Sequence, residues 1–225
     1  MYLPRTGGLI VIEGCDAAGK ATNVKKLAER FDSLGSNAIT FSFPRYDTVV
    51  GKAILRHLKG RIAMREEHSI DSSDMRIDGE TTYRTAEPED ALAFQALCAV
   101  DKYDAAADIQ AHLALGRVVI CDRWWQSAFC FGSSDGLDED WLYRIHSGLP
   151  QPWLNIFIDV PPEEALRRRP EARDRYERDR EKQKVVRANY ERLWTNAGVD
   201  YVKIDGLGTP EEVHERIWSA LENRP

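Results

Sequence analysis

The sequence predicts an α/β fold in which helices cover both faces of a five-stranded parallel sheet. Short apolar runs alternate with helical patterns along the chain, which is typical of parallel sheets. The length of 225 residues, with 43% hydrophobic and 30% charged residues, suits one large domain with a substantial core. A glycine-rich loop joins the first apolar run to the first helical pattern. Since no linker or internal repeat interrupts these patterns, residues 1–225 are predicted to form a single domain.

The first predicted elements are a strand at residues 9–12 and a helix that begins after Lys20 and runs to Phe31. Between them lies a Gly-x-x-x-x-Gly-Lys loop, whose backbone N–H groups, following helix and lysine predict a site for a nucleoside triphosphate. A glycine-rich turn without a ligand is the alternative interpretation. The residues predicted to bind the triphosphate are Gly14, Cys15, Ala17, Ala18, Gly19, Lys20, Ala21 and Thr22.

The remaining elements continue the alternation, and several helices begin or end at Pro or Gly. The segment from Gly132 to Gly136 is predicted as a loop. Strands are expected at residues 38–43, 117–121, 154–160 and 200–205. Helices are expected at residues 49–58, 88–115, 124–131 and 139–146, with two more that start at residues 161 and 210.

Two segments break this pattern. Residues 61–87 mix charges with Ser, Asp and Gly and show no sustained period, so we expect an inserted excursion, partly disordered or a short hairpin around Asp78-Gly79. Residues 167–187 are crowded with arginine and lysine, interleaved with acidic residues. This second segment is either a site for anionic groups or a solvated helix face, because pairs such as Asp174 and Arg178 have i,i+4 spacing.

The composition excludes several classes of protein. With a formal net charge of −6, the chain is not expected to bind nucleic acid or an anionic membrane, so an anionic substrate must meet local clusters of Arg and Lys. No apolar run approaches membrane-spanning length, and too few residues precede the first strand for a signal peptide. The four cysteines lack metal-ligand spacing. Buried or loop thiols in a reducing compartment explain them, so we expect a cytoplasmic protein.

Four motifs occur in a fixed order along the chain. They are Glu13-Gly-Cys-Asp-Ala-Ala-Gly-Lys20, Phe43-Pro-Arg-Tyr46, Asp122-Arg123 followed by Ser127, and Asp174-Arg-Tyr-Glu177. With these motifs the chain resembles the thymidylate kinases, nucleoside-monophosphate kinases with a P-loop NTPase fold, over nearly its whole length except residues 61–87. The resemblance implies transfer of the γ-phosphoryl group of ATP to dTMP, with Mg²⁺ as cofactor, in dTTP synthesis.

The resemblance implies catalytic roles for Lys20, Arg45, Arg123, Asp16 and Arg173. Lys20 would reach the β- and γ-phosphates, Arg45 would hold the acceptor phosphate with its planar fork, and Arg123 would bridge the two phosphates. Asp16 would orient the acceptor, with helix capping as the alternative role. No catalytic base is required, because a phosphate monoester is already ionised near neutral pH.

A lid over ATP is implied at residues 167–180, where Arg169, Arg173 and Arg175 would act in the manner of an arginine finger. Ala17 and Ala18 leave the phosphate loop uncharged, which favours the lid-arginine type of the family. Gly206 and the residues up to Thr209 would carry backbone contacts to adenine.

The loop departs from the usual pattern at the residue after the lysine, where Ala21 replaces a Ser or Thr that commonly ligates Mg²⁺. Asp16 and Glu177 then become the natural oxygen ligands for a hard cation, and Asp122 would meet Mg²⁺ through water. For Asp122, an internal ion pair with Arg123 is an equal alternative.

The acceptor-binding residues implied by the resemblance are Asp16, Phe43, Pro44, Arg45, Tyr46, Cys98, Lys102, Arg123, Ser127, Phe131 and Tyr176. The family usually has Phe and Arg against the thymine, where this chain has Cys98 and Lys102. Trp124, Trp125 and Phe131 would supply another wall of the pocket, or belong to the core.

These departures leave alternatives open. The acceptor is predicted to be dTMP, with dUMP or a 5-substituted dUMP as alternatives. A deoxynucleoside kinase and a nucleotide-binding protein that has lost turnover are the competing functions. The resemblance also implies a homodimer, for which the helix at residues 88–115 could serve.

Overall fold

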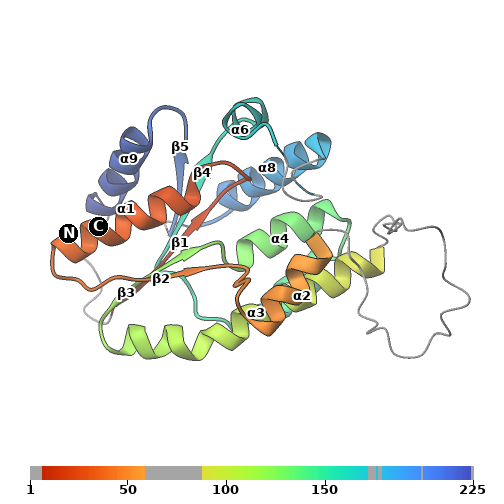
Figure 1. Ribbon diagram of the computed structural model, residues 1–225, viewed down its shortest axis with the longest axis horizontal. Coiled ribbons are helices and arrows are strands. Elements are labelled where there is room, and N and C mark those ends of the chain that lie inside the picture. Colours follow the sequence, from red (N-terminus) through yellow and green to blue (C-terminus); the bar gives the residue numbers. More distant parts are fainter. Residues whose placement is uncertain (1–6, 59–87, 172–175, 177–178, 199, 224–225) are drawn as a thin grey trace, which may run out of the picture.

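A computed structural model describes residues 7–58, 88–171, 176, 179–198 and 200–223. Its five strands are all parallel and lie in the order β2-β3-β1-β4-β5, so the predicted α/β fold is confirmed (Figure 1). The strands are β1 (Gly8–Glu13), β2 (Ile39–Ser42), β3 (Val118–Asp122), β4 (Leu154–Asp159) and β5 (Tyr201–Asp205). The excursion predicted at residues 61–87, including Asp78-Gly79, lies outside the described residues.

Eight helices surround this sheet in the described part of the chain. They are α1 (Lys20–Ser33), α2 (Val49–Leu58), α3 (Pro88–Ala114), α4 (Trp125–Ser134), α5 (Glu139–Arg144), α6 (Pro162–Arg168), α8 (Arg180–Thr195) and α9 (Pro210–Glu222). The loop predicted from Gly132 was wrong, because α4 continues to Ser134. Gly132 serves there as a packing site: a Cβ atom at this position would lie 2.6 Å from the Leu142 side chain.

Alternate side chains of β1 supply the two halves of the core. Ile10 and Ile12 pack with Leu27 of α1 and with α9, whereas Leu9 and Val11 pack with Ile109 of α3. Figure 1 shows α1 and α9 on one side of the sheet and α3 and α4 on the other. Because helices cover both faces, the strand reads as an unbroken apolar run rather than an alternating one. Each such side chain contributes roughly 1.5–3 kcal/mol when fully buried.

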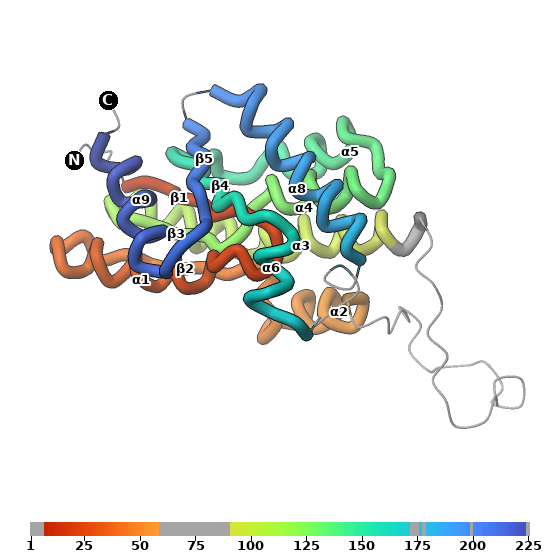
Figure 2. Tube along the Cα trace, turned by 90° about the horizontal axis from the view of Figure 1, so that it is seen from above, coloured from red at the N-terminus to blue at the C-terminus, as the bar shows by residue number. Residues whose placement is uncertain are grey.

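Helix α8 lies along α4 in both views of the molecule (Figures 1 and 2). The sequence patterns leave a solvated helix face as one of two interpretations of residues 167–187, and they assign no element to residues 188–195. Its inner face carries Tyr190, which stacks on Phe157 of β4 with ring centroids 5.0 Å apart. The helix begins at the Asp179 cap, whose side chain accepts from the Lys182 N–H at 2.9 Å. This packing brings the first turns of α8 to the carboxyl ends of the strands.

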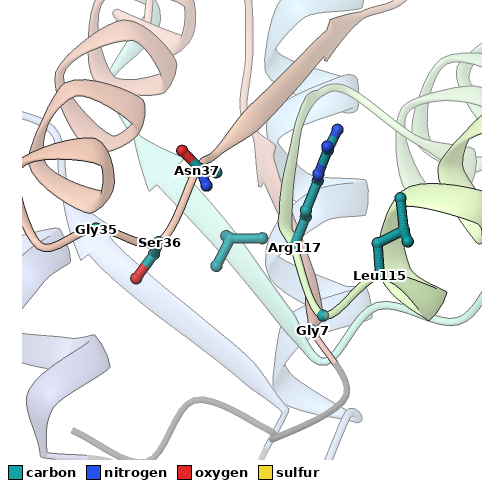
Figure 3. Close-up of a pocket in the computed structure, with 8 residues that line it drawn as sticks. Gly7, Gly35, Ser36, Asn37, Leu115 and Arg117 are labelled. Atoms are coloured by element: carbon teal, nitrogen blue, oxygen red, sulfur yellow. The ribbon is translucent and has the colours of Figure 1, made fainter.

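The two edges of the sheet differ in chemistry. The loops that follow β1, β2 and β3 meet at the carboxyl edge, where open α/β sheets bind their ligands. The amino edge carries a shallow cavity of about 550 Å³, shown in Figure 3 and lined by Gly7, Gly35, Ser36, Asn37, Leu115, Gly116, Arg117 and Val118. Those residues surround the starts of the strands, so this cavity is remote from the phosphate loop.

Within the described residues, no helix has the length and apolarity needed to span a membrane.

Candidate active site

The loop between β1 and α1 needs glycine at both of its ends. Gly14 has φ +152°, and a Cβ atom there would lie 2.7 Å from the Ile158 carbonyl oxygen. Gly19 has φ +89° and is the residue from which α1 starts, without any side-chain cap. Ala17 also has a positive φ, of 59°. Backbone curvature of this kind turns successive N–H groups toward one point, as binding of phosphate oxygens requires.

The Lys20 side chain folds back over the loop. Its Nζ donates to the carbonyl oxygens of Gly14 at 3.0 Å and of Cys15 at 2.9 Å. Burial lowers the pKa of Lys20, and the nearby Arg123 acts in the same direction, while carboxylates including Asp122 and Asp16 oppose the shift. The ammonium group is therefore desolvated and positioned by the loop itself, where incoming phosphates would replace its carbonyl partners.

The other predicted loop residues differ in their accessibility. Burial raises the pKa of the Cys15 thiol to about 12, so this cysteine stays protonated at neutral pH. Ala18 is also buried, whereas Ala21 and Thr22 are exposed on the first turn of α1. A shift of one residue turns a side chain by about 100° around a helix, so the Thr22 hydroxyl does not replace the one missing at Ala21.

Arg123 joins the phosphate loop to α4. Its backbone is in the left-handed region, with φ 68°, and its N–H donates to the Ile12 carbonyl at 3.0 Å. From this turn the guanidinium donates to Asp16 Oδ1 at 2.6 Å, to the Gly14 carbonyl at 3.2 Å and to Ser127 Oγ at 3.1 Å. The predicted neighbours Asp16, Arg123 and Ser127 are thus brought together by the structure.

Asp16 pairs with Arg123 across the site and does not cap α1, because that helix has no side-chain cap. Burial alone would raise the pKa of Asp16, but Arg123, Lys20, Gln183 and Arg169 together hold it below the usual value. Gln183 of α8 donates to Asp16 Oδ2 at 3.2 Å. Arg169, one of the predicted lid arginines, therefore lies close enough to act on the loop carboxylate.

Glu13 is a central residue of the site that the sequence patterns did not single out. Its side chain is fully buried and accepts from the Trp124 N–H at 2.7 Å, the Ser127 N–H at 3.2 Å and the Tyr190 hydroxyl at 2.8 Å. The Ser127 hydroxyl donates to it as well. From the end of β1, Glu13 thereby caps the N-terminus of α4 and supports the turn that carries Arg123. In the sequence, the position of Glu13 at the start of the loop motif is the signal that could have indicated this role.

The Glu13 carboxyl predicts a measurable pH dependence. Burial raises the pKa of Glu13, against the opposing effects of Arg123, Ser127, Tyr190 and the Trp124 N–H. Because the folded-state pKa exceeds the unfolded value of about 4.3, the stability due to this group falls as pH rises between the two values. Glu13→Gln removes this titration. Urea unfolding between about pH 4 and 8 should show the stability of the wild type relative to Glu13→Gln decreasing with pH. A relative stability that rises with pH would contradict the assignment.

The predicted phosphate ligand Arg45 is held by two carboxylates of α3. Its Nε donates to Asp101 Oδ1 at 2.9 Å, and its Nη2 donates to Asp104 Oδ2 at 2.6 Å. The Arg45 backbone N–H also donates to Asp101, at 3.0 Å. These bonds orient the guanidinium, and they use Nε and Nη2 while Nη1 makes no hydrogen bond to the described residues. The adjacent Pro44 follows a cis peptide bond and Tyr46 is exposed.

Phe43, Cys98 and Lys102 converge beside Arg45. All three side chains are buried, and Lys102 Nζ lies 5.9 Å from the Phe43 ring centroid while it donates to the Cys98 carbonyl at 3.0 Å. Burial lowers the pKa of Lys102. Trp124 is fully buried in the cluster of β1 and α3, with its ring 5.1 Å from Phe43. It therefore belongs to the core behind Phe43, which was the alternative assignment.

Phe131 and Tyr176 form the other side of this region, with ring centroids 5.2 Å apart. Gly206 lies at the end of β5, where its N–H donates to the Asp159 carbonyl and its own carbonyl accepts from Arg168. A Cβ atom at Gly206 would meet Val160 at 2.5 Å. The predicted residues Arg173, Arg175 and Glu177 lie outside the described residues.

Carboxylate ligands for a metal are sparse in the described part of the chain. It contains no group of three or more His, Cys, Asp or Glu residues that could hold a metal ion. Of the predicted ligands, Asp16 is paired with Arg123 and Asp122 is buried at the end of β3. A metal at this site would therefore need phosphate oxygens and water among its ligands.

Comparison with known proteins finds similar proteins over nearly the whole chain. A family model described as thymidylate kinase matches residues 12–71 and 79–217. A thymidylate kinase of Schizosaccharomyces pombe is 28% identical over 96% of this chain and 92% of its own length. A probable thymidylate kinase of Pyrococcus horikoshii is 32% identical over 96% and 97%. A solved thymidylate kinase from Candida albicans has a TM-score of 0.75 at 25% identity, over 96% of this chain and 91% of its own. The chain therefore belongs to the thymidylate kinase family of P-loop nucleoside-monophosphate kinases.

Proposed function

We propose that the protein transfers the γ-phosphoryl group of ATP to the phosphate of dTMP, which yields dTDP and ADP. An oxygen of the acceptor phosphate forms a bond to the γ-phosphorus, and the bond from that phosphorus to the β–γ bridging oxygen breaks. The observation that supports this best is the position of Arg123. Its guanidinium bonds Asp16 and the Gly14 carbonyl on the loop side, and Ser127 on the side of α4.

The cationic side chains would together neutralise the negative charge of the phosphates, which is the main contribution of the protein in phosphoryl-transfer enzymes. Lys20 would bind the β- and γ-phosphates, and Arg45 would bind the acceptor phosphate through Nη1. Arg123 would contact both phosphates at once. Arg169 and Arg173 would close over ATP, and the first of these already influences Asp16.

Mg²⁺ forms part of this proposal. It commonly keeps several waters and binds one or two carboxylates together with phosphate oxygens. Asp16 and Asp122 would bind such a partly hydrated ion. The Asp16 oxygens already accept hydrogen bonds from Arg123 and Gln183, so Asp16 would contact the ion through a bound water molecule. Glu177 would be the third ligand. The ion would supply charge neutralisation on the phosphates.

A coupled ADP-release assay tests the reaction directly. The assay uses ATP with dTMP, dUMP, 5-substituted dUMP, dCMP and thymidine as separate acceptors. We expect turnover with dTMP and none with thymidine, because the Asp16 carboxylate is already paired with Arg123 and so is not available as a base for a hydroxyl acceptor. Binding of ATP without ADP release in the presence of any monophosphate would contradict the proposal.

Replacing Arg45 is expected to weaken binding of the acceptor dTMP and to leave binding of ATP unchanged. Loss of a charge-assisted hydrogen bond should raise the KM for dTMP by roughly 10- to 100-fold. Arg45→Ala also leaves the buried Asp101 unpaired, so Arg45→Lys is the better variant: it keeps the charge and loses the planar fork. Arg56→Ala, at an exposed position of α2, is the control. Equal changes in the KM values of ATP and dTMP would contradict the assignment.

We further infer a homodimer that forms through α3. Leu92, Ala96 and Val100 are spaced by four residues along this helix, and Tyr103 lies on the same outer face. Leu92, Val100 and Tyr103 are respectively 48%, 50% and 42% exposed, so the stripe is apolar and open to a second copy. Val100→Asp should convert a dimer into a monomer in sedimentation velocity. A wild-type monomer at micromolar concentration would contradict the inference.

A cytoplasmic location is also part of the proposal. All four cysteines are free and buried, which suits a reducing compartment. Cell fractionation with an antibody to the protein tests it, and recovery outside the cytosol would contradict it.

A further inference from the structure

Helix α8 meets the phosphate loop through polar side chains on one of its faces. Gln183, Arg187 and Tyr190 follow one another by four and then three residues, so they form a single stripe along the helix. Gln183 donates to Asp16 Oδ2 at 3.2 Å. Tyr190 is fully buried, and its hydroxyl donates to Glu13 Oε2 at 2.8 Å. The stripe therefore joins α8 to the end of β1 and to the loop that follows it.

The ring and the hydroxyl of Tyr190 make separate contacts. The ring stacks on Phe157 of β4, which holds the residue in the core. The hydroxyl oxygen lies 2.8 Å from Ser127 Oγ and 3.5 Å from Arg123 Nη1. Burial raises the pKa of Tyr190 well above its usual value, and Glu13 adds to this shift, so the hydroxyl keeps its hydrogen at neutral pH. Removal of the hydroxyl alone would thus leave the packing of the ring in place.

Each hydroxyl of this cluster has a single hydrogen to donate. The hydroxyls of Ser127 and Tyr190 both donate to Glu13 Oε2. Their lone pairs are then left as acceptors, and the donor that faces them is Arg123 Nη1, which lies 3.1 Å from Ser127 Oγ. Two hydroxyls therefore connect a buried carboxylate to a guanidinium, and hydrogen bonds in such a chain strengthen one another.

The contacts of Arg123 divide its guanidinium into a bound side and an open side. Nη1 donates to the Gly14 carbonyl at 3.2 Å and to the two hydroxyls, which occupies both of its hydrogens. Nη2 uses one hydrogen on Asp16 Oδ1, and Nε makes no hydrogen bond to the described residues. The Nε hydrogen and the second Nη2 hydrogen remain for a phosphate. Where they point depends on how Nη1 is held.

We propose that Tyr190 is a positioning residue for Arg123, whose guanidinium it orients, together with Ser127, toward the transferring phosphoryl group. The proposal rests on the proposed function for the role of Arg123, but the contacts that carry it involve no substrate. Tyr190 lies on α8, and this helix begins where the lid region implied at residues 167–180 ends. One helix would therefore both follow the lid and hold the arginine that contacts the phosphates.

Tyr190→Phe tests the proposal because it removes the hydroxyl and keeps the ring on Phe157. The loss of one hydrogen bond from the cluster should lower kcat with dTMP and ATP by about tenfold. The KM for ATP should stay within about twofold, since the contacts of Lys20 do not involve Tyr190. Tyr143→Phe is the matched control, because Tyr143 is 58% exposed on α5, and it should keep the wild-type kcat.

The same change in an Arg123→Lys background distinguishes positioning from a merely structural role. The planar guanidinium is absent there, so Tyr190→Phe should lower kcat by less than about twofold. A residue that only stabilises the fold would lower kcat by the same factor in both backgrounds. Equal factors would therefore overturn the proposal.

Nuclear magnetic resonance of the Arg123 guanidinium separates this proposal from the reaction. In isotope-labelled protein, a held guanidinium rotates slowly about its Nε–Cζ bond and gives distinct Nη1 and Nη2 signals, which Arg123→Lys identifies by their loss. Tyr190→Phe should speed this rotation by about tenfold, and Tyr143→Phe should not change it. If the wild type shows no turnover with dTMP, the proposed function fails, while the rotation rate still tests the positioning role. A rotation rate unchanged by Tyr190→Phe would overturn the positioning role alone.

Discussion

Replacement of Lys20 by methionine is expected to lower kcat by about 10²- to 10³-fold, the usual cost of one preorganised donor at developing charge. Lys20 Nζ donates to the Gly14 and Cys15 carbonyl oxygens, so the side chain already points into the loop. Methionine has a similar length and no charge, and it removes the donor without leaving a large cavity. Steady-state kinetics with saturating dTMP and ATP measure the effect.

A matched lysine on the same helix controls for the loss of charge. Lys25 lies on the outer side of α1, where its side chain is 79% exposed. Lys25→Met should therefore keep kcat within about twofold, since surface substitutions away from special features have small effects. The thermal unfolding midpoint of Lys20→Met should stay near that of the wild type. An active Lys20→Met variant with normal kcat would remove Lys20 from the mechanism.

Replacement of Arg123 by lysine is expected to lower kcat/KM for dTMP by about 10³-fold, at the lower end of values for an arginine that stabilises a transferring phosphoryl group. The guanidinium reaches Asp16, the Gly14 carbonyl and Ser127 together. A lysine keeps the charge but not the planar fork, so it cannot keep all three contacts while it binds two phosphates. Both kcat and the KM for dTMP should change, because the residue is assigned to both sides of the reaction.

The left-handed backbone of Arg123 makes a control for folding necessary. Arg123→Lys keeps a side chain of comparable length at φ 68°, and circular dichroism should show wild-type helix content. Arg144→Lys, at an exposed position near the end of α5, provides the matched conservative change. Wild-type kcat/KM in Arg123→Lys would show that no bidentate contact is made there.

Local chemistry made the fold and the backbone geometry of the phosphate loop predictable. The run at β1 is apolar at successive positions, and Gly14, Gly19 and Lys20 follow it at fixed spacing. Such signals lie within about 20 residues of one another, so they survive in the sequence without knowledge of tertiary contacts. The loop predicted from Gly132 failed for the opposite reason. Glycine commonly ends a helix, but here Leu142 fills the space of its missing side chain.

The parallel α/β fold, the phosphate loop and the family resemblance can be predicted from the sequence, because these features depend on residues close together in the chain. The side chains that complete the site, in contrast, become known from the folded chain. Glu13 bonds Tyr190 across 177 positions of sequence, and Tyr176 bonds Asp135 across 41. Such pairs depend on how helices dock on the sheet. A carboxylate at the end of a strand can cap a helix or face water, and the sequence does not distinguish these two roles. The role of such a residue is therefore known only from the folded structure.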